Sequence, residues 1–191
     1  MREGYLFIFS APSGAGKTTL CHKILEKIEH TVNSISYTTR KPRKNEQNGR
    51  DYFFISHEDF EKFKKQNFFA EWAQVYDEFY GTSHKFLQNE TAQGNDVILD
   101  IDIQGAHQIK KKYGKRAITF FLLPPSEKEL RKRLETRGTE SQDSIDKRFS
   151  YARSEMQEAS QFDYQVVNDD LSQAFEKVKK IILTLRNEST K

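Results

Sequence analysis

The sequence has little cysteine, no long apolar run and almost no net charge, and each shortage excludes a class of protein. The single cysteine, Cys21, leaves no disulfide framework and no cysteine metal site within the chain. No apolar stretch approaches the length of a membrane-spanning helix. The 31 basic and 28 acidic side chains leave a net charge of +3, which is a weak argument for nucleic acid or an acidic membrane as a partner.

The sequence also lacks internal repeats, low-complexity tracts and the pattern of a signal peptide. We therefore expect a cytoplasmic protein that binds neither nucleic acid nor membrane. Its 191 residues suffice for one domain with a sizeable hydrophobic core.

A glycine-rich segment near the N-terminus matches the pattern of a phosphate-binding loop. It reads Ala11-Pro12-Ser13-Gly14-Ala15-Gly16-Lys17-Thr18, with alanine in place of the usual first glycine. An apolar strand-like run (5–9) precedes it and a segment with helical spacing follows, as the motif requires. In such a loop the lysine neutralises phosphate charge and the hydroxyl of Thr18 binds Mg²⁺. The segment predicts a nucleoside triphosphate site; the alternative is an ordinary turn with a chance lysine.

Alternating apolar runs and amphipathic segments predict an α/β fold. Buried strands are expected at 5–9, 96–105, 117–125 and 164–169, with helices at 126–138, from about 146 to 161, and at 171–187. Residues 33–95 differ, because a polar, basic stretch is followed by helices at 56–67 and 83–94 around aromatic strands at 68–82. The pattern predicts a doubly wound parallel sheet, with sites at the carboxyl ends of its strands, interrupted by a mixed α+β insert.

Two carboxylates end the apolar run that begins at residue 96. Asp100 and Asp102 are two residues apart, so in a strand they point the same way. An aspartate at the end of a strand resembles the second element that supports Mg²⁺ in phosphate-loop enzymes, directly or through water. The alternative for either residue is that it caps a helix.

A basic cluster runs from Arg40 to Arg50, with five basic residues in eleven and one acid, Glu46. One interpretation is a solvated loop or an RNA-contacting patch. The other is a monophosphate site, because Arg40 and Arg43 flank a stiffening proline and arginine pairs with phosphate through two parallel hydrogen bonds. Tyr52 and Tyr80 are placed to add phenol donors to the same anion.

Glu71 lies between aromatic residues in an otherwise apolar segment. A carboxylate there needs donors, and guanine offers two adjacent N–H groups where adenine offers none. The alternative is a strand residue that faces solvent.

These segments together resemble the guanylate kinases over nearly the whole chain. The resemblance rests, in order, on SAPSGAGK, SYTTRKPRKNEQNGRDY, EWAQVYDEFYGT, ILDIDIQG, RLETRGTES and VVNDD. It implies a kinase that transfers the γ-phosphoryl group of ATP to GMP with Mg²⁺. It also implies a single guanylate kinase-like domain spanning residues 1–191. Its parts would be a phosphate-loop core (1–32, 96–137 and 162–191), a GMP-binding insert (33–95) and a helical lid (138–161).

The resemblance also assigns roles to residues. For ATP it implies Ser13, Gly14, Ala15, Gly16, Lys17, Thr18, Thr19 and Asn168. For GMP it implies Ser36, Glu71, Thr82 and Asp102 around guanine, and Arg40, Arg43, Glu46, Tyr52 and Tyr80 at the phosphate. Lys17, Arg137 and Arg148 would act on the transferring phosphoryl group, and Thr18 and Asp100 would hold Mg²⁺.

Two other functions remain open at this point. A binding module of the same fold would recognise a phosphorylated partner, but it has no need of the intact loop that Lys17 and Thr18 complete. A related kinase for another small phosphorylated substrate would have no use for Glu71. The sequence allows a homodimer without requiring one.

Overall fold

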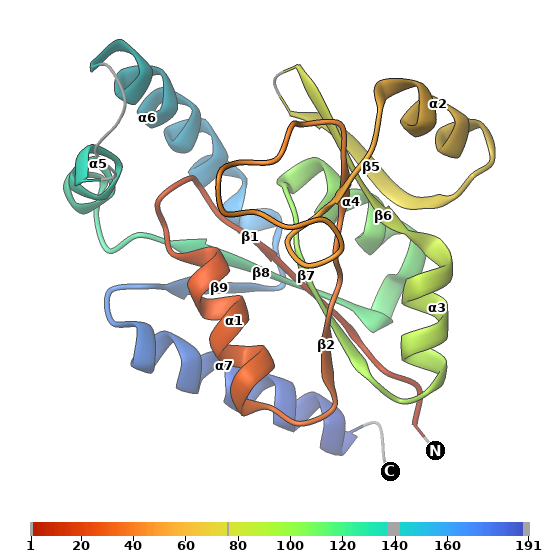
Figure 1. Ribbon diagram of the computed structural model, residues 1–191. Helices are drawn as coiled ribbons and strands as arrows, with labels where there is room; N and C mark the ends of the chain where they lie inside the picture. The colour runs from red at the N-terminus through yellow and green to blue at the C-terminus, as the bar shows by residue number, and fades with distance from the viewer. Residues whose placement is uncertain (1, 76, 137–141, 189–191) are drawn as a thin grey trace.

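The computed structural model describes residues 2–75, 77–136 and 142–188, and its centre is a parallel sheet of five strands (Figure 1). The strands lie in the order β2 (Thr31–Asn33), β7 (Asp96–Asp100), β1 (Leu6–Ser10), β8 (Ala117–Leu123) and β9 (Tyr164–Val167). Every neighbouring pair in this sheet is parallel. The doubly wound parallel sheet that the sequence predicts is therefore confirmed.

Helices cover both faces of this sheet, because successive strand side chains point to opposite faces. Phe7 and Phe9 of β1 pack with α1 (Lys17–Lys27) and α7 (Leu171–Glu188). Leu6 and Ile8 pack toward α3 (His84–Ala92) and α4 (Ile103–Tyr113) on the other face. All four side chains of β1 are at most 1% exposed. The strand is thus buried on both faces, as its continuous apolar run predicts.

The strand predicted at 96–105 ends earlier than the sequence suggests. β7 stops at Asp100, and α4 begins at Ile103, a helix that the sequence analysis did not find. Asp102 is the N-cap of α4, where its Oδ1 accepts a hydrogen bond from the backbone N–H of Gly105 at 3.0 Å. The apolar alternation continues through Ile101 and Ile103, so periodicity alone could not mark the boundary. The helix-capping alternative for Asp102 is correct.

A second sheet of four strands is formed by residues between 37 and 83. Its order is β4 (Phe53–Phe54), β3 (Tyr37–Thr38), β6 (Glu78–Ser83) and β5 (Phe69–Val75). The hairpin of β5 and β6 was expected, whereas β3 is too short to show a pattern in the sequence. Helix α2 (His57–Lys65) packs Phe60 on Phe69 of β5, with ring centroids 4.5 Å apart. Its N-cap Ser56 accepts from the N–H of Asp59, as the sequence predicts.

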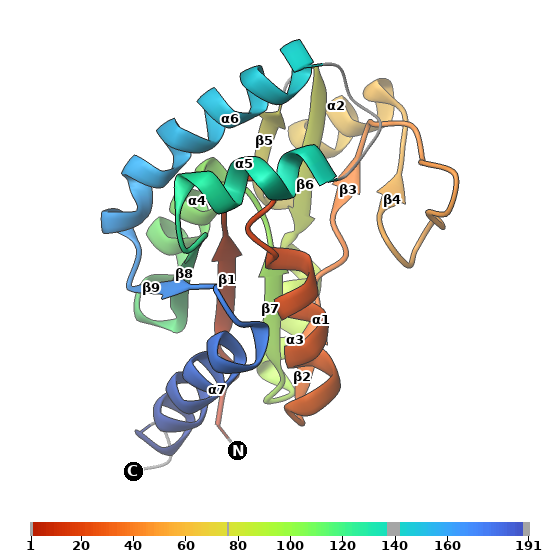
Figure 2. The same ribbon diagram turned by 90° about the vertical axis from the view of Figure 1, so that its left-hand side faces the viewer.

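Helices α5 (Glu127–Thr136) and α6 (Gln142–Gln157) lie at the end of the central sheet where β1 leads into α1 (Figure 2). They pack on each other through a small apolar cluster that includes Leu130 and Leu134 of α5. Both leucines also approach Gly14. Short 3₁₀ turns follow α4 (Gly114–Arg116) and α6 (Glu158–Gln161).

A buried carboxylate ties together the opposite end of the molecule, where the N- and C-terminal segments meet (Figure 1). Asp96, which is 0% exposed, accepts from the guanidinium of Arg2 and from that of Arg186, each at 2.7 Å. It also accepts from the backbone N–H of Tyr5 at 2.8 Å. This network joins the first residues, β7 and α7.

Candidate active site

The glycine-rich loop joins β1 to α1 in the conformation that the motif demands. Gly14 and Gly16 have φ of 93° and 90°, a region that other residues rarely adopt. Gly16 is the N-cap of α1, so the helix begins at Lys17 with its N-terminus toward the loop. Unpaired N–H groups and the helix dipole favour an anion at this point. The segment therefore has the backbone geometry that a phosphate-binding loop requires.

Lys17 and Thr18 meet Asp100 at the carboxyl end of β7. Lys17 Nζ lies 2.7 Å from Asp100 Oδ1 and donates to the carbonyl of Ile101 at 2.8 Å. Thr18 Oγ1 donates to Asp100 Oδ2 at 2.9 Å. Burial lowers the pKa of the Lys17 ammonium, but the charge and hydrogen bond of Asp100, together with Cys21 and Tyr52, outweigh burial, so the net shift is upward. The lysine is thus held charged beside the loop.

Asn168, just beyond β9, contacts the same loop. Its Nδ2 donates to the carbonyl of Ala15 at 2.7 Å, and the side chain is buried. A Cβ on Gly16 would lie 2.4 Å from this Nδ2, so only glycine fits there. Asn168 thus fixes the loop and also borders the space above it.

That space is a cavity of about 430 Å³ between the loop and α5. Besides loop residues and Asn168, its lining includes four polar side chains of α5, Glu129, Lys132, Arg133 and Thr136. The sequence analysis missed these four. The spacing of three, four and seven residues puts them on one face of the helix, opposite the buried Leu130 and Leu134. This polar stripe is visible in the sequence and could have identified the four residues.

Glu71 lies on the buried side of β5 together with Ala73, just after a register shift between Phe69 and Glu71. The carboxylate is 3% exposed, so the alternative of a solvent-facing glutamate is wrong. The facing residue on the paired strand is Thr82 of β6, whose Oγ1 donates to Glu71 Oε1 at 2.5 Å. Burial raises the pKa of Glu71 to about 7, and the charge of Asp102 adds to that shift.

Ser36 and Asp102 are the two further residues predicted for the base. Ser36 is buried at 8% exposure, and its carbonyl accepts from the N–H of Phe53 at 2.9 Å. Asp102 shares the first turn of α4 with Gly105, which abuts the Glu71 carboxylate. The structure therefore brings Glu71, Thr82 and Asp102 into one region.

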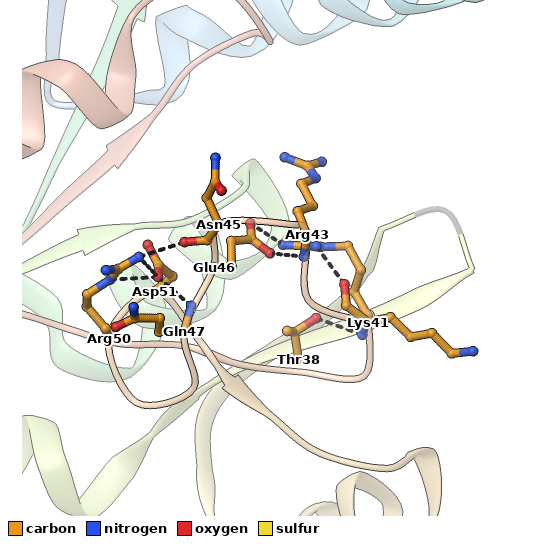
Figure 3. Close-up of polar contacts among 9 residues, drawn as sticks. Thr38, Lys41, Arg43, Asn45, Glu46, Gln47, Arg50 and Asp51 are labelled. Carbon is orange, nitrogen blue, oxygen red and sulfur yellow. Dashed lines mark hydrogen bonds and ion pairs between the residues drawn. The ribbon is translucent and has the colours of Figure 1, made fainter. Parts of the chain in front are cut away.

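Arg40 is held in place by the loop that carries it (Figure 3). Its Nη2 donates to Glu46 Oε1 at 2.8 Å and its Nη1 to the carbonyl of Lys41 at 2.8 Å. The other oxygen of Glu46 accepts from the backbone N–H of Arg43 at 2.7 Å. The hydrogen bond from Arg40 holds the pKa of Glu46 below its usual value. A loosely solvated loop does not describe this arrangement.

The two arginines of this loop differ. The Arg40 guanidinium lies over the Tyr52 ring, 5.4 Å from its centroid, and is less exposed than Arg43. The Arg43 side chain is exposed, and Figure 3 shows it extending away from Glu46. The hydrogen bond to Glu46 raises the pKa of the Arg40 guanidinium, and Tyr80 adds to that shift. Arg40 is preorganised, and Arg43 is available to move onto a ligand.

Tyr52 links the arginine loop to the phosphate loop. Burial raises the pKa of its phenol, and the Asp100 carboxylate raises that pKa further, while Lys17 and Arg40 act in the opposite direction. One phenol thus interacts with groups of both loops. The loop that carries Arg40 therefore lies near Lys17 and Asp100, where we expect phosphate to bind.

Helix α6 adds two side chains to the site. Arg148 Nη2 donates to Ser13 Oγ of the phosphate loop. Burial raises the pKa of Glu155, which also interacts with the charges of Lys17 and Asp102. The sequence analysis missed Glu155. The predicted Arg137 lies outside the described residues, as do residues 138–141 of the predicted lid.

A parallel sheet whose first strand leads through a glycine-rich Lys-Thr loop into a helix, with an aspartate at the end of the neighbouring strand, is typical of phosphate-loop phosphotransferases. The model of the guanylate kinase family matches residues 3–185. The guanylate kinase of Geobacter metallireducens is 48% identical over 97% of this chain and 91% of its own length. That of Caldanaerobacter subterraneus is 46% identical over 95% of this chain and 88% of its own length.

A solved structure agrees with these relatives. The crystal structure of guanylate kinase from Anaplasma phagocytophilum superposes with a TM-score of 0.82 at 30% identity, covering 100% of this chain and 89% of that one. The chain belongs to the guanylate kinase family, and the resemblance inferred from its motifs is confirmed. None of the helices in the described ranges combines the length and the apolar character needed to cross a bilayer.

Proposed function

We propose that this protein transfers the γ-phosphoryl group of ATP directly to the phosphate of GMP, giving ADP and GDP. The observation that carries this assignment is the contact of both Lys17 and Thr18 with Asp100 at the end of β7, in a chain of the guanylate kinase family. Arg40, which lies over the Tyr52 ring, would hold the acceptor phosphate, and two neighbouring phosphate sites suit an in-line transfer between two bound nucleotides.

On the ATP side, the N-terminus of α1 and the backbone of residues Ser13 to Gly16 hold the β- and γ-phosphates. Lys17 then leaves Asp100 for the phosphates, because a triphosphate offers it more negative charge. The sugar and adenine occupy the 430 Å³ cavity beside Asn168 and α5, with Thr19 at its border. Support comes from the α5 lining, which supplies cations and hydrogen-bonding groups around an open volume.

On the GMP side, Arg40 supplies a preset guanidinium and Arg43 swings in to complete the phosphate clamp, with Tyr52 and Tyr80 as phenol donors. Glu46 acts on GMP through Arg40, since its two oxygens already accept from Arg40 and Arg43. Glu71 accepts the ring and exocyclic N–H groups of guanine, and Ser36, Thr82 and Asp102 border the base. We assign residues 33–95 to this GMP-binding insert and residues 1–32, 96–137 and 162–191 to the core.

The residues at the loop also fit Mg²⁺. The hydroxyl of Thr18 and the carboxylate of Asp100 are hard oxygen ligands only 2.9 Å apart. Within the described ranges there is no group of three or more histidine, cysteine, aspartate or glutamate side chains suited to a metal. Phosphate oxygens and water would therefore complete the shell, as Mg²⁺ commonly requires. Bound with ATP, the ion would neutralise charge on the phosphates.

The lid, assigned to residues 138–161, would close over both nucleotides and exclude water that would otherwise hydrolyse ATP. Support comes from Arg148, which already reaches Ser13 of the loop. Arg137 would join it at the transferring phosphoryl group. The partners are then the two nucleotides, in the cytoplasm, and a homodimer stays an expectation.

The test is to incubate the purified protein with ATP, GMP and MgCl₂ and to separate the nucleotides by ion-exchange chromatography. ADP and GDP should appear in equal amounts, and omission of Mg²⁺ should abolish both. ADP formed without GDP would show that the protein hydrolyses ATP and does not transfer phosphate to GMP. No ADP at all, with tight binding of a phosphorylated peptide, would instead support the binding-module alternative.

A further inference from the structure

Gly105 stands in the first turn of α4, where glycine is the costlier choice. It is buried, and its φ is outside the positive region, so the backbone there suits any residue. Alanine stabilises a helix interior by roughly 1 kcal/mol relative to glycine. Neither the conformation nor helix propensity explains a glycine at this position.

The environment of Gly105 does explain it. A Cβ built there would lie 2.6 Å from Glu71 Oε2 and 3.1 Å from Glu71 Cδ. The carboxylate of Glu71 therefore occupies the space that a side chain at 105 would fill. The next atom, Ile101 Cδ1 at 3.3 Å, is a weaker obstacle.

The Glu71 carboxylate is also constrained on its other side. Its Oε1 accepts from Thr82 Oγ1, and Thr82 is 0% exposed. A methyl group at 105 would push Oε2 away from α4 and break or bend that hydrogen bond. Because the carboxylate is the far end of a flexible side chain, the clash can be relieved by moving Glu71 rather than by moving the helix.

Gly105 contacts the second carboxylate of the region as well. Its backbone N–H donates to Asp102 Oδ1 at 3.0 Å, which fixes Asp102 as the N-cap of α4. One residue thus sets the position of both carboxylates, Asp102 through its N–H and Glu71 through its missing side chain.

We propose that Gly105 is a specificity-determining positioning residue, whose lack of a side chain lets the Glu71 carboxylate face guanine with both oxygens correctly placed. The inference rests on the proposed reading of guanine by Glu71. It predicts that base discrimination depends on a helix residue that contacts no nucleotide.

The experiment compares Gly105→Ala with the unmodified protein in steady-state kinetics with GMP and with IMP, which lacks only the exocyclic amine. We expect kcat/KM for GMP to fall by about tenfold or more, equivalent to about 1.4 kcal/mol. We expect kcat/KM for IMP to fall less, so the GMP to IMP ratio shrinks. KM for ATP should stay within about twofold, and the melting temperature should be equal or higher.

Gln104→Ala is the matched control, because Gln104 is the exposed neighbour on the same helix. It raises helix propensity in the same turn without approaching Glu71, and it should leave the GMP to IMP ratio unchanged. The double variant Glu71→Asp/Gly105→Ala tests the contact directly, since a shorter carboxylate leaves room for the methyl group. The two substitutions should be less damaging together than the sum of their separate effects predicts.

Glu71→Gln, measured in parallel, tests separately whether Glu71 recognises guanine and whether Gly105 positions Glu71. If Glu71→Gln loses guanine selectivity and Gly105→Ala keeps it, the role of Gly105 is wrong while the proposed function stands. If Glu71→Gln keeps full selectivity, the reading of guanine by Glu71 fails first. A Gly105→Ala variant that melts lower and loses GMP and ATP affinity equally would show an ordinary packing defect and overturn the inference.

Discussion

Lys17 and Asp100 form an ion pair in which the ammonium nitrogen lies 2.7 Å from a carboxylate oxygen. The lysine proposed to bind phosphate is thus held by the carboxylate proposed to support Mg²⁺. Binding of the magnesium complex of ATP would exchange these partners, lysine for phosphate and carboxylate for the ion. The ion pair positions both side chains for their ligands, and neither charge is left without a partner before ATP binds.

Lys17→Ala should lower kcat by at least about two powers of ten, because an electrostatic clamp of this kind contributes several kcal/mol at the transition state. A coupled assay of ADP release measures the effect. Lys27→Ala, an exposed lysine on the same helix, should behave like the unmodified protein. Near-normal turnover in Lys17→Ala would show that the proposed catalytic role of the phosphate loop is wrong.

Arg40→Lys and Arg43→Lys should each raise KM for GMP while leaving KM for ATP almost unchanged, because lysine cannot form the two-pronged contact with phosphate. Arg40→Lys should have the larger effect, since it also loses the bond to Glu46 that orients the side chain. Initial rates with each nucleotide varied in turn give both constants. Equal losses for ATP and GMP would point to a folding defect.

The pH dependence of GMP use should report Glu71, whose pKa burial raises to about 7. Only the ionised carboxylate accepts both guanine N–H groups, so kcat/KM for GMP should fall as pH drops below about 7. The limiting slope is roughly tenfold per pH unit. Glu71→Gln should lose this limb of the profile.

The phosphate of GMP also titrates at a pH not far from 7. The pH profile of the unmodified protein must therefore be compared with that of Glu71→Gln. If the unmodified protein and Glu71→Gln show the same acid limb, the limb belongs to the nucleotide and not to Glu71.

Asp96→Ala should destabilise the fold by about 3 kcal/mol, because it removes the partner of two largely buried guanidinium groups. Urea unfolding measures the change. Glu58→Gln, which alters an exposed surface acid, should stay within about 0.5 kcal/mol. Catalysis by Asp96→Ala at low temperature should be intact, since Asp96 lies at the end of the sheet opposite the loops.

Local patterns were enough to predict four of the five strands of the central sheet, the glycine-rich loop and most of the helices, whereas β2 was not expected. Each depends on residues close in sequence, such as the strand, glycines and helix around Lys17 or the Ser126 hydroxyl that accepts from the N–H of Glu129. Helix α4 was missed because the apolar alternation of β7 runs on into its first turn, and only the cap at Asp102 marks the change.

The parts of the site that the sequence did not reveal depend on contacts across the fold. Glu71 and Thr82 were both expected at the base, but the hydrogen bond between them follows from the pairing of β5 with β6. The approach of Glu155 to Lys17 depends on how α6 lies over the sheet. No local spacing encodes these distances, although the polar stripe on α5 was visible in the sequence.

The most direct test of the account is the choice of acceptor by the unmodified protein, measured as kcat/KM for GMP, IMP and AMP at fixed ATP. A site with a paired acceptor for two guanine N–H groups should accept IMP roughly ten to a hundred times less efficiently than GMP. AMP should be poorer by up to about four powers of ten, because it leaves the Glu71 carboxylate unpaired. Equal efficiency with GMP and IMP, or AMP within about tenfold of GMP, would contradict the account.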